Sequence, residues 1–515
     1  MTTTVEQPDV GVARTPPSRG VLAVAGVVAG ASGIALSQAT AWALRLDTSP
    51  VGAVAAVVRD ATPGRLAEAL IGLVGTLDKP LLLGGTVLVL LAVIGYAASW
   101  VRRVPLVPDL VFLALGGVGL AAVMSQRPGG VGAPLAVLVG LMTWVVSLRL
   151  LTGPLLDDRH GTDADARRQF LRRVGLVVVG AAAVTAAGRF AGGARRQVEQ
   201  SRRLLRLPVR AGDVPQAADL KVGISPWRTP NADFYQIHTA LASPTIRPED
   251  WELRIHGLVD REVRVGYQDL VGRELTEAWV TLCCVSNEVG GDLVGNAFWS
   301  GVPVRELLAR AGVDASADCV LQTSDDGWTC STPLEALTDD RDALLAVAMN
   351  GQPLPVEHGF PVRVVVPGLY GYVSATKWVV DLEVTRFADV TAFWTERGWG
   401  ERGPVKTQSR IDVPRDGESL AAGRVALGGV AWAQHTGIAK VEVQVDGGAW
   451  QEAELGGVPD DDTWVQWLLR TDLDEGDHEV VVRATDKSGY TQTPVETDVV
   501  PDGATGWDSR RFRVG

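Results

Sequence analysis

The chain has 515 residues, so two or three domains are expected rather than one. Its formal net charge of −12 argues against nucleic acid as a partner, because phosphate binding needs a concentrated basic surface. The composition changes along the chain: up to about Leu151 the residues are mostly Ala, Val, Leu and Gly, and after about Gln197 they are typical of a soluble protein. We therefore predict a membrane domain over residues 1–195 and water-soluble domains after it.

The first domain contains five apolar segments, and a helix needs about 20 apolar residues to cross a bilayer. The first, second and fourth segments reach this length easily, the third carries Asp109 near its start, and the fifth is shorter. The segments are Val21–Leu44, Pro80–Val101, Leu106–Met124, Val131–Leu148 and Val174–Gly188. Because none of them has a polar face, we predict an N-terminal transmembrane α-helical bundle rather than the buried helices of a soluble protein.

Arginines in the loops predict the orientation of this bundle. Two arginines precede the first segment, Arg102 and Arg103 follow the second, and six arginines lie between positions 149 and 173. Cytoplasmic loops are enriched in Lys and Arg. We therefore expect the N-terminus on the cytoplasmic side of the cell membrane and the C-terminal half on the extracytoplasmic side. The arginines between Arg195 and Arg206 follow the fifth segment on the predicted outer side, so they argue against this orientation.

The segment that begins at Arg167, RRQFLRRVGLVVVGAAAVTAAG, resembles a bacterial twin-arginine export signal. Such signals are addresses that a receptor reads. The route carries folded proteins, so the outer half would fold before export. A plain basic flank of a membrane helix is the alternative interpretation.

The membrane domain has no histidine before His160. Haem within a membrane usually needs histidine ligands, so no haem is expected. The sequence therefore predicts a multi-pass anchor in the lipid bilayer, and a site for an electron-transfer partner, either a quinone or a redox protein, stays open.

From Trp251 onward, short strands alternate with turns, and short helices are predicted over Val304–Ala311 and Pro333–Leu337. This pattern predicts a mixed α+β domain over residues 196–398. Cys319 and Cys330 bracket a predicted hairpin, so these cysteines could form a disulfide or remain two separate buried thiols.

The stretch TLCCVSNEVGG, from Thr281 to Gly291, places the other two cysteines side by side. Neighbouring cysteines do not readily bridge each other. The pair therefore indicates either packing of small apolar side chains or the binding of a ligand by one thiol.

Several motifs in this half resemble the sulfite oxidase family of molybdopterin enzymes. In chain order they are TPNADFYQIHTAL, DWELRIHGLV, TLCCVSN, AFWSGVPVRELL and MNGQPLPVEHGFPVRVVVPGLYGYVSATKW. The resemblance extends from Asn231 to the C-terminus. It implies an oxidoreductase with a molybdenum–molybdopterin cofactor that catalyses two-electron oxygen-atom transfer.

The resemblance makes Cys284 the catalytic residue and the molybdenum ligand, since thiolates suit soft metals. Cys283 should then point to the opposite face of an extended segment and pack. Cationic side chains and backbone donors suit the phosphate and polar edges of a pterin cofactor. The other cofactor-binding residues that the resemblance implies are Asn231, Tyr235, Gln236, His238, Thr323, His358, Arg363, Ala375, Thr376 and Lys377.

Two departures from the family pattern bear on the substrate. Gln236 stands where many sulfite-oxidising members have Arg, and Val347 stands where they often have an aromatic residue. A site without that arginine loses a bidentate donor for an oxyanion. The FY pair before Gln236 is also similar to bacterial reductases of the family that act on sulfoxides. The substrate is therefore expected to be either a small oxyanion or a sulfoxide.

The last part of the chain, residues 399–515, alternates apolar and polar residues, as in IAKVEVQVDGGAWQEAEL. Asp446 and Gly447 in this stretch are typical of a hairpin turn. The pattern predicts an immunoglobulin-like β-sandwich. Its core would contain Trp432, Trp450, Trp464 and Trp467. In the family this domain often mediates dimers, so the resemblance allows a homodimer.

A function from another class would be a non-enzymatic membrane receptor or adhesion protein with a degenerate oxidoreductase domain. The joint presence of Cys284, His358, Arg363 and Lys377 argues against it.

Overall fold

The structure is a computed structural model that describes residues 16–44, 46, 48–62, 78–125, 132–156, 163–191 and 193–515. The chain divides into two compact units, Met1–Ala194 and Arg195–Gly515, and each is described by itself.

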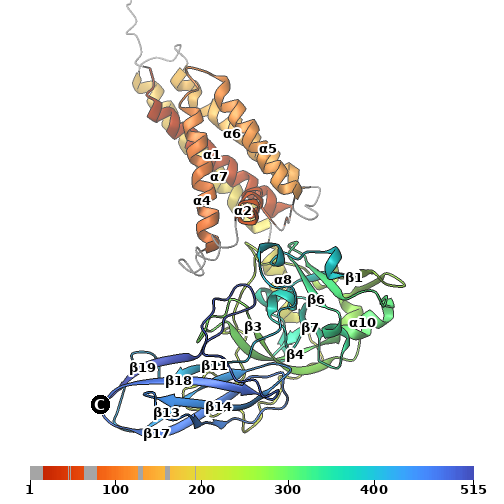
Figure 1. The fold of residues 1–515 in the computed structure, drawn as a ribbon. Helices are drawn as coiled ribbons and strands as arrows, with labels where there is room; N and C mark the ends of the chain where they lie inside the picture. The colour runs from red at the N-terminus through yellow and green to blue at the C-terminus, as the bar shows by residue number, and fades with distance from the viewer. Residues whose placement is uncertain are drawn as a thin grey trace, which may run out of the picture. The chain divides into compact units, whose positions relative to one another are not determined.

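The first unit is helical (Figure 1). Its described helices are α1 (Arg19–Ala43), α2 (Pro50–Ala61), α4 (Asp78–Ala98), α5 (Leu106–Ser125), α6 (Ala133–Leu156) and α7 (Asp163–Ala191). All of these except α2 are long and apolar enough to cross a membrane. The five predicted apolar segments correspond to these five helices. The sequence interpretation missed α2, although Ser49 caps its N-terminus and Pro50 occupies its first turn.

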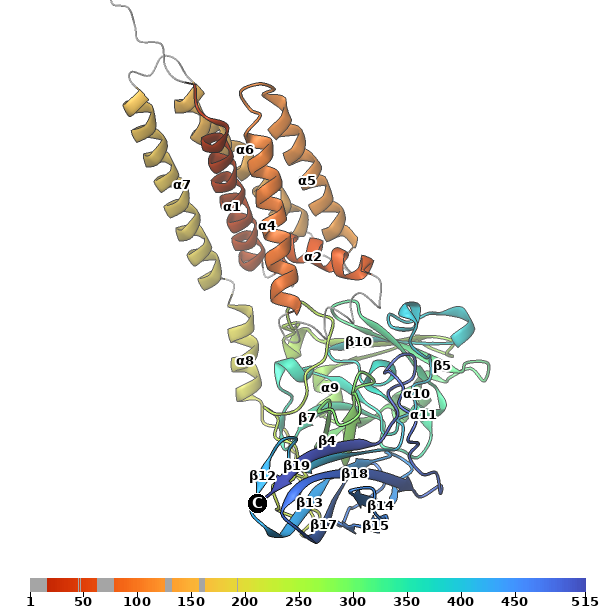
Figure 2. The same cartoon turned by 60° about the vertical axis from the view of Figure 1, so that its left-hand side comes forward.

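Helix α1 packs against α4, α6 and α7 (Figure 2). Small residues on α1 allow these contacts, because a Cβ atom on Gly26 would lie 2.5 Å from the Cβ of Ala98 on α4. On the side of α6, Trp144 donates from Nε1 to the carbonyl of Gly30 at 3.0 Å. Helix α7 leaves most of its apolar surface uncovered within this unit.

The second unit includes nearly all of α8 (Ala194–Leu204) and contains four sheets. We refer to its residues up to Gly398 as the middle domain and to the residues from Trp399 as the C-terminal domain.

The middle domain has two sheets. The first has the order β2-β1-β10-β5-β6, in which only β1 and β10 are parallel. Its strands are β1 (Glu252–Gly257), β2 (Val263–Gly266), β5 (Cys319–Ser324), β6 (Thr329–Pro333) and β10 (Val379–Thr385). The second has the order β3-β4-β7-β8, with β9 paired to β7. Its strands are β3 (Thr276–Cys283), β4 (Val294–Pro303), β7 (Leu344–Met349), β8 (Gln352–Pro353) and β9 (Arg363–Val365).

Three short helices flank these sheets: α9 (Tyr267–Val271), α10 (Val304–Ala311) and α11 (Glu335–Thr338). Helix α10 has the bounds that the sequence predicted. Helix α11 starts later than predicted, because Pro333 still belongs to β6.

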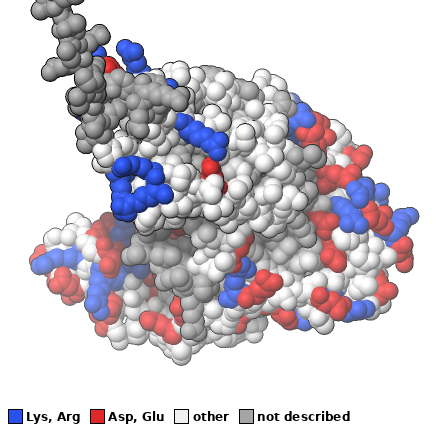
Figure 3. Space-filling view, turned by 90° about the horizontal axis from the view of Figure 1, so that it is seen from above, with Lys and Arg blue, Asp and Glu red and all other residues white. Residues whose placement is uncertain are grey.

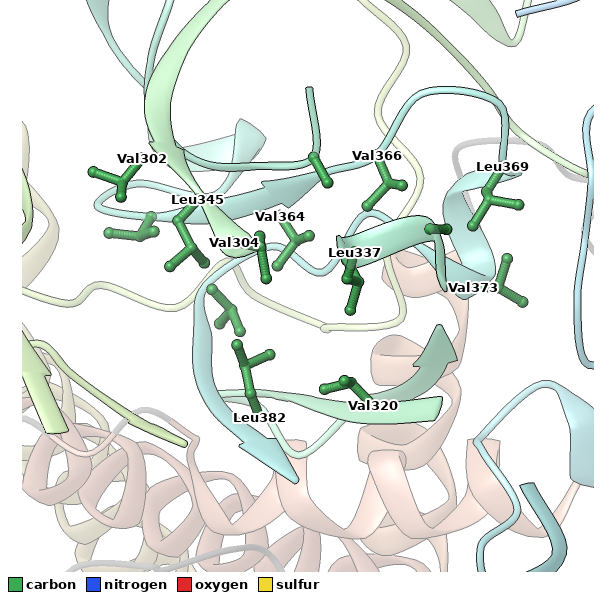
Figure 4. Packing of buried hydrophobic residues seen from close by; sticks show 14 of the residues in the cluster. Val302, Val304, Val320, Leu337, Leu345, Val364, Val366, Leu369, Val373 and Leu382 are labelled. Atoms are coloured by element: carbon green, nitrogen blue, oxygen red, sulfur yellow. The ribbon is translucent and has the colours of Figure 1, made fainter. Parts of the chain in front are cut away.

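The core of the middle domain lies between its two sheets. Figure 4 shows Val302, Leu345 and Val364 of the second sheet pointing toward Val320 and Leu382 of the first. All five side chains are buried. Burial of a Val or Leu side chain contributes about 1.5–3 kcal/mol, so this layer fixes the two sheets relative to each other.

The C-terminal domain consists of two further sheets with the orders β11-β13-β17-β16 and β12-β19-β18-β14-β15. The strands are β11 (Gln408–Val413), β12 (Ser419–Leu420), β13 (Gly423–Trp432), β14 (Ile438–Val445), β15 (Gln451–Glu452), β16 (Glu454–Leu455), β17 (Val465–Leu473), β18 (Gly476–Asp486) and β19 (Asp508–Val514). Apolar residues of both sheets form one core. Asp446 and Gly447 turn the chain after β14 with positive φ angles of 51° and 69°, as predicted.

The prediction for the tryptophans of this domain was wrong in part. Trp467 lies in the core between the two sheets, but Trp432 and Trp464 pack with residues of the middle domain instead. Trp450 is half-buried and contacts Trp507. The sequence pattern shows which side chains are apolar, but not which domain covers them.

Candidate active site

The two neighbouring cysteines have different surroundings. Cys283 is the last residue of β3 and packs in the core of the middle domain. Cys284 follows the strand and is also buried. Burial raises the pKa of both thiols, but hydrogen bonds from Ser286 and the charge of Lys377 oppose this rise at Cys284. Cys284 therefore has the donors and the cation that stabilise a thiolate.

Residues 284–293, which we refer to as the Cys284 loop, connect β3 to β4 and are closed by internal hydrogen bonds. The amide of Cys284 donates to the carbonyl of Leu293 at 2.9 Å, and the amide of Asn287 donates to the carbonyl of Cys284 at 3.1 Å. The side chain of Asn287 accepts from the amide of Leu293 at 2.8 Å. Asn287 is buried, and its motif alone predicts no role for it.

Arg363 is a buried cation on β9, with 3% of its surface exposed. Its Nη1 and Nη2 atoms donate to the carbonyls of His358 and Ala375 at 3.3 and 3.4 Å. Its guanidinium lies 5.0 Å from the ring centre of Trp299. None of the ion pairs among the described residues includes Arg363, and burial lowers its pKa to about 10. A buried guanidinium without a carboxylate partner is suited to an anion that binds here.

His358 lies beside Arg363 and is neutral, because burial, followed by the charges of Lys377 and Arg363, lowers its pKa to about 3. Its Nε2 donates to the carbonyl of Asn231 at 2.9 Å. Its Nδ1 is buried and has no hydrogen-bond partner among the described residues. The free Nδ1 is thus an acceptor that a ligand donor could satisfy.

Gly359 brings the turn after His358 against the loop of Lys377. Its φ angle is +107°, and a Cβ atom here would lie 2.9 Å from the Cβ of Arg363 and 3.1 Å from the Cα of Lys377. Only glycine fits this conformation and this approach without strain. The three polar side chains of His358, Arg363 and Lys377 consequently belong to one compact group.

Asn231 and Tyr235 border this group. Asn231 accepts from Nδ2 of Asn350 at 2.7 Å and donates to the carbonyl of Met349 at 3.2 Å. Tyr235 stacks on Phe234 with ring centres 5.2 Å apart. Burial, followed by the electrostatic effect of Cys284 and Cys283, raises the pKa of Tyr235 far above its usual value, so its hydroxyl stays protonated. Asn350, which the sequence interpretation missed, precedes Gly351 in a turn with positive φ angles.

Thr376 and Ala375 precede Lys377 and are both buried. The carbonyl of Thr376 accepts from the amide of Val364 at 2.8 Å, and its hydroxyl contacts the thiol of Cys330 at 3.2 Å. Cys330 therefore supports this segment.

The predicted hairpin is present as β5 and β6, with Cys319 opposite Pro333 and Cys330 opposite Gln322. All four cysteines are free thiols. The structure thus has the two separate buried thiols rather than the disulfide.

Three predicted residues are less closely associated with the group. Gln236 is exposed. His238 meets the ring of Trp378 edge-on, with ring centres 5.5 Å apart. Thr323 lies within β5, and none of the described hydrogen bonds connects its side chain to the group. The structure therefore gives no direct support for a contact between Thr323 and the cofactor.

Two family models match the second unit: the oxidoreductase molybdopterin binding domain over residues 240–394 and the Mo-co oxidoreductase dimerisation domain over residues 404–500. Mitochondrial sulfite oxidase from Homo sapiens is 30% identical over 315 residues, which cover 52% of this chain and 57% of that protein. The uncharacterized oxidoreductase YuiH from Bacillus subtilis is 35% identical over 153 residues, which cover 30% of this chain and 74% of that protein.

The chain belongs to the sulfite oxidase family of molybdopterin oxidoreductases. Among solved structures, the sulfane dehydrogenase SoxCD from Paracoccus pantotrophus matches 61% of this chain and 88% of its own, with 24% identity and a TM-score of 0.48. The chain spans just over half the length of the mammalian sulfite oxidases that it matches. The matched oxidoreductase segment contains Cys284, His358, Arg363 and Lys377, whereas Asn231, Tyr235, Gln236 and His238 precede it.

The residues of the site fit the molybdopterin cofactor of this family. Among the described residues, the buried cation Arg363 has no anion beside it and the buried Nδ1 acceptor of His358 has no donor. Within the described residues, no group of three or more His, Cys, Asp or Glu side chains could hold a metal ion. Cys284 would hold the metal of this cofactor through its sulfur.

Proposed function

We propose that this protein is a membrane-anchored, extracytoplasmic oxidoreductase that catalyses two-electron oxygen-atom transfer to or from a small substrate. The observation that carries this proposal is the grouping of Cys284, Lys377, His358 and Arg363 within the matched molybdopterin domain. His358, Arg363 and Lys377 follow Cys284 by more than 70 residues in the sequence. Cys284, His358 and Arg363 are nevertheless buried, and so is the Nζ atom of Lys377.

In this proposal each side chain has a defined task. Cys284 holds molybdenum through its thiolate, and Lys377 stabilises the negative charge on that sulfur. Arg363 binds the cofactor phosphate through charge-assisted hydrogen bonds, and neutral His358 accepts a hydrogen bond at Nδ1. Tyr235 remains protonated and can donate from its hydroxyl. When bound, the cofactor supplies an open coordination position and stores two electrons.

The remaining predicted residues would bind the pterin from the edges of the site. Asn231 is held by Asn350 and can orient a polar edge. Ala375 and Thr376 would contribute backbone groups, while His238 would contact the cofactor next to Trp378. Thr323 remains a proposed contact without structural support.

The substrate is a small oxyanion or a sulfoxide, and Gln236 favours the sulfoxide. An exposed amide can donate a hydrogen bond to a neutral S=O group, but it supplies no charge to balance a dianion such as sulfite. Sulfoxide reduction consumes two electrons and two protons and releases water. Sulfite oxidation takes up water and releases two electrons and two protons. Both reactions need an external redox partner, either a quinone or a redox protein.

Five apolar helices and the arginine-rich loops between them support the membrane anchor and its orientation. The segment that begins at Arg167 would serve as an uncleaved twin-arginine signal. The C-terminal domain would be an immunoglobulin-like sandwich, and the match to a dimerisation domain supports a homodimer. Along the right-hand and lower edges of the face visible in Figure 3, Lys and Arg lie beside Asp and Glu.

Metal analysis and turnover of the full-length protein in detergent test this function. We expect close to one molybdenum per chain, a Mo(V) electron paramagnetic resonance (EPR) signal after partial reduction, and turnover with dimethyl sulfoxide and a reduced viologen or with sulfite and an oxidised dye. Protein that contains zinc or iron but no molybdenum would refute it. Turnover of sulfite alone would retain the enzyme class and reject the preference inferred from Gln236.

A further inference from the structure

Two arginines of the C-terminal domain donate hydrogen bonds to consecutive carbonyl groups of the Cys284 loop. Arg410 on β11 donates from Nη1 to the carbonyl of Gly291 at 2.8 Å. Arg510 on β19 donates from Nη2 to the carbonyl of Gly290 at 3.3 Å. The C-terminal domain thus contacts the middle domain at the loop that begins with the proposed metal ligand.

Both arginines are themselves held in place. Arg410 is 6% exposed, and its Nε donates to Asp412 at 2.7 Å. Its Nη2 donates to the hydroxyl of Ser225 at 3.0 Å, so all three nitrogens of the guanidinium have partners. Arg510 forms an ion pair with Asp508. Because each donor is fixed by an acidic residue of its own domain, the two carbonyls of the loop are held against a rigid frame.

The loop packs closely against this frame. Gly290 has a φ angle of +72°, and a Cβ atom on it would lie 2.5 Å from Oδ1 of Asp508 and 2.8 Å from Nη2 of Arg510. A Cβ atom on Gly291 would lie 2.7 Å from Oδ1 of Asn287. The glycines therefore leave no free space between the C-terminal domain and the side chain that closes the loop.

Short contacts continue from the glycines to Cys284. The Oδ1 atom of Asn287 accepts from the amide of Leu293, and Leu293 accepts from the amide of Cys284. The amide of Asn287 also donates to the carbonyl of Cys284. A displacement of the Gly290–Gly291 carbonyls would therefore change the backbone of Cys284 itself, through one buried side chain.

We propose that Arg410 and Arg510 are positioning residues: they hold the Cys284 loop and thereby set the direction in which the Cys284 sulfur meets the metal. This inference rests on the proposed function, since it assumes a metal on Cys284. It assigns the C-terminal domain a role in the active site of its own chain, separate from any role in dimer formation. A contact that only joined the two domains would affect stability and leave the metal environment unchanged.

The test compares Arg410→Lys with a control variant in the full-length protein. Lysine keeps the charge but cannot reach Asp412, Ser225 and Gly291 together. Gln466→Ala is the control, because Gln466 joins the C-terminal domain to the middle domain through Leu220 and Ser225 without touching the Cys284 loop. Molybdenum content, the Mo(V) EPR signal, kcat, KM and Tm are measured for each variant.

We expect Arg410→Lys to shift the Mo(V) g-values and to lower kcat by about 10–100-fold, the usual range for the loss of a group that orients a metal ligand. Molybdenum content and KM should change little, and Gln466→Ala should lower Tm without moving the g-values. Wild-type g-values and kcat in a molybdenum-loaded Arg410→Lys protein would overturn the proposal.

Arg510→Gln provides a second, milder variant in case Arg410→Lys does not fold. The side chain of Arg510 is more exposed than that of Arg410, and its hydrogen bond to the loop is longer. We expect a shift of the g-values in the same sense but smaller, and no shift would overturn the proposal. A wild-type protein without molybdenum is a different result, because it would refute the proposed function itself.

Discussion

Replacement of Arg363 by Met should stabilise the cofactor-free protein and at the same time weaken its hold on the cofactor. Arg363 is 3% exposed and has no carboxylate partner among the described residues. Its charge therefore opposes folding until an anion binds beside it. The two effects have opposite signs, which distinguishes a binding residue from one that simply supports the fold.

The expected size follows from the burial of the guanidinium. Burial lowers the pKa of Arg363 from 12.5 to about 10. Each pH unit of such a difference corresponds to about 1.4 kcal/mol, so the charged form costs about 3 kcal/mol in the cofactor-free protein. Methionine removes this cost and keeps a contact with Trp299. It also loses three hydrogen bonds, all at 3.3–3.4 Å and therefore weak. We expect a net gain in unfolding free energy of about 1–2 kcal/mol.

The assay is thermal unfolding of the full-length protein from cells that cannot make the cofactor, together with the cofactor content of protein from normal cells. Without cofactor, the Arg363→Met variant should have a higher Tm than the wild type. From normal cells, its cofactor content should be lower than that of the wild type by about tenfold or more, since each charge-assisted hydrogen bond to phosphate contributes about 1.5–3 kcal/mol. Arg341→Met is the matched control: Arg341 is also largely buried but pairs with Asp339 at 2.7 Å, so its loss should lower Tm. A cofactor-free Arg363→Met protein less stable than the wild type would refute the reasoning.

Three further predictions follow from other residues. Cys284→Ser should abolish turnover but retain the fold and much of the pterin, whereas Cys283→Ala should stay active; exchanged outcomes would make Cys283 the ligand. Desolvation of the carboxyl group and then the neighbouring carboxylates raise the pKa of Asp460 from 3.8 to about 6, although the residue itself is partly exposed. The native state therefore holds this proton to higher pH than the unfolded state. Stability should fall as the pH rises through about 4–7, and Asp460→Asn should raise Tm much more at about pH 7.5 than at about pH 3. Replacement of Arg167 and Arg168 by Lys should block export of a C-terminal reporter, and normal export would exclude a twin-arginine signal.

Local patterns in the sequence were sufficient for many of the secondary-structure elements. The predicted bounds of α10 agree with the structure, and Gly327, with a φ angle of +85°, lies in the turn where the hairpin was expected. The predicted apolar segments of the first unit overlap long helices for the same reason. Each of these elements is determined by residues within its own segment of the chain.

Packing between domains was not predictable in this way. Trp464 donates from Nε1 to the carbonyl of Trp227, and Trp227 donates from Nε1 to the carbonyl of Trp464, at 2.8 and 3.1 Å. This reciprocal pair joins the middle and C-terminal domains. Because the alternation of a strand shows only that a residue faces inward, it could not distinguish the core of the sandwich from the boundary with another domain.

In the candidate site, too, local motifs predicted some residues, whereas residues from distant segments were not predicted. Family motifs indicated Arg363, His358 and Lys377, because these residues lie in continuous stretches of recognisable sequence. The residues that hold them, such as Trp299 under Arg363 and Asn350 beside Asn231, come from other strands and turns. Only the fold shows which neutral side chains complete a charged site.

The orientation of Cys284 is the clearest case. Side chains along β3 point alternately to its two faces, and this alternation accounts for the direction of Cys283, which ends the strand and packs in the core. Cys284 lies beyond the strand, so alternation no longer determines where its sulfur points. Its amide is bound to Leu293 within a loop whose carbonyls are held by Arg410 and Arg510. The direction of the proposed metal ligand thus depends on two strands from the far end of the chain, which no pattern near TLCC could reveal.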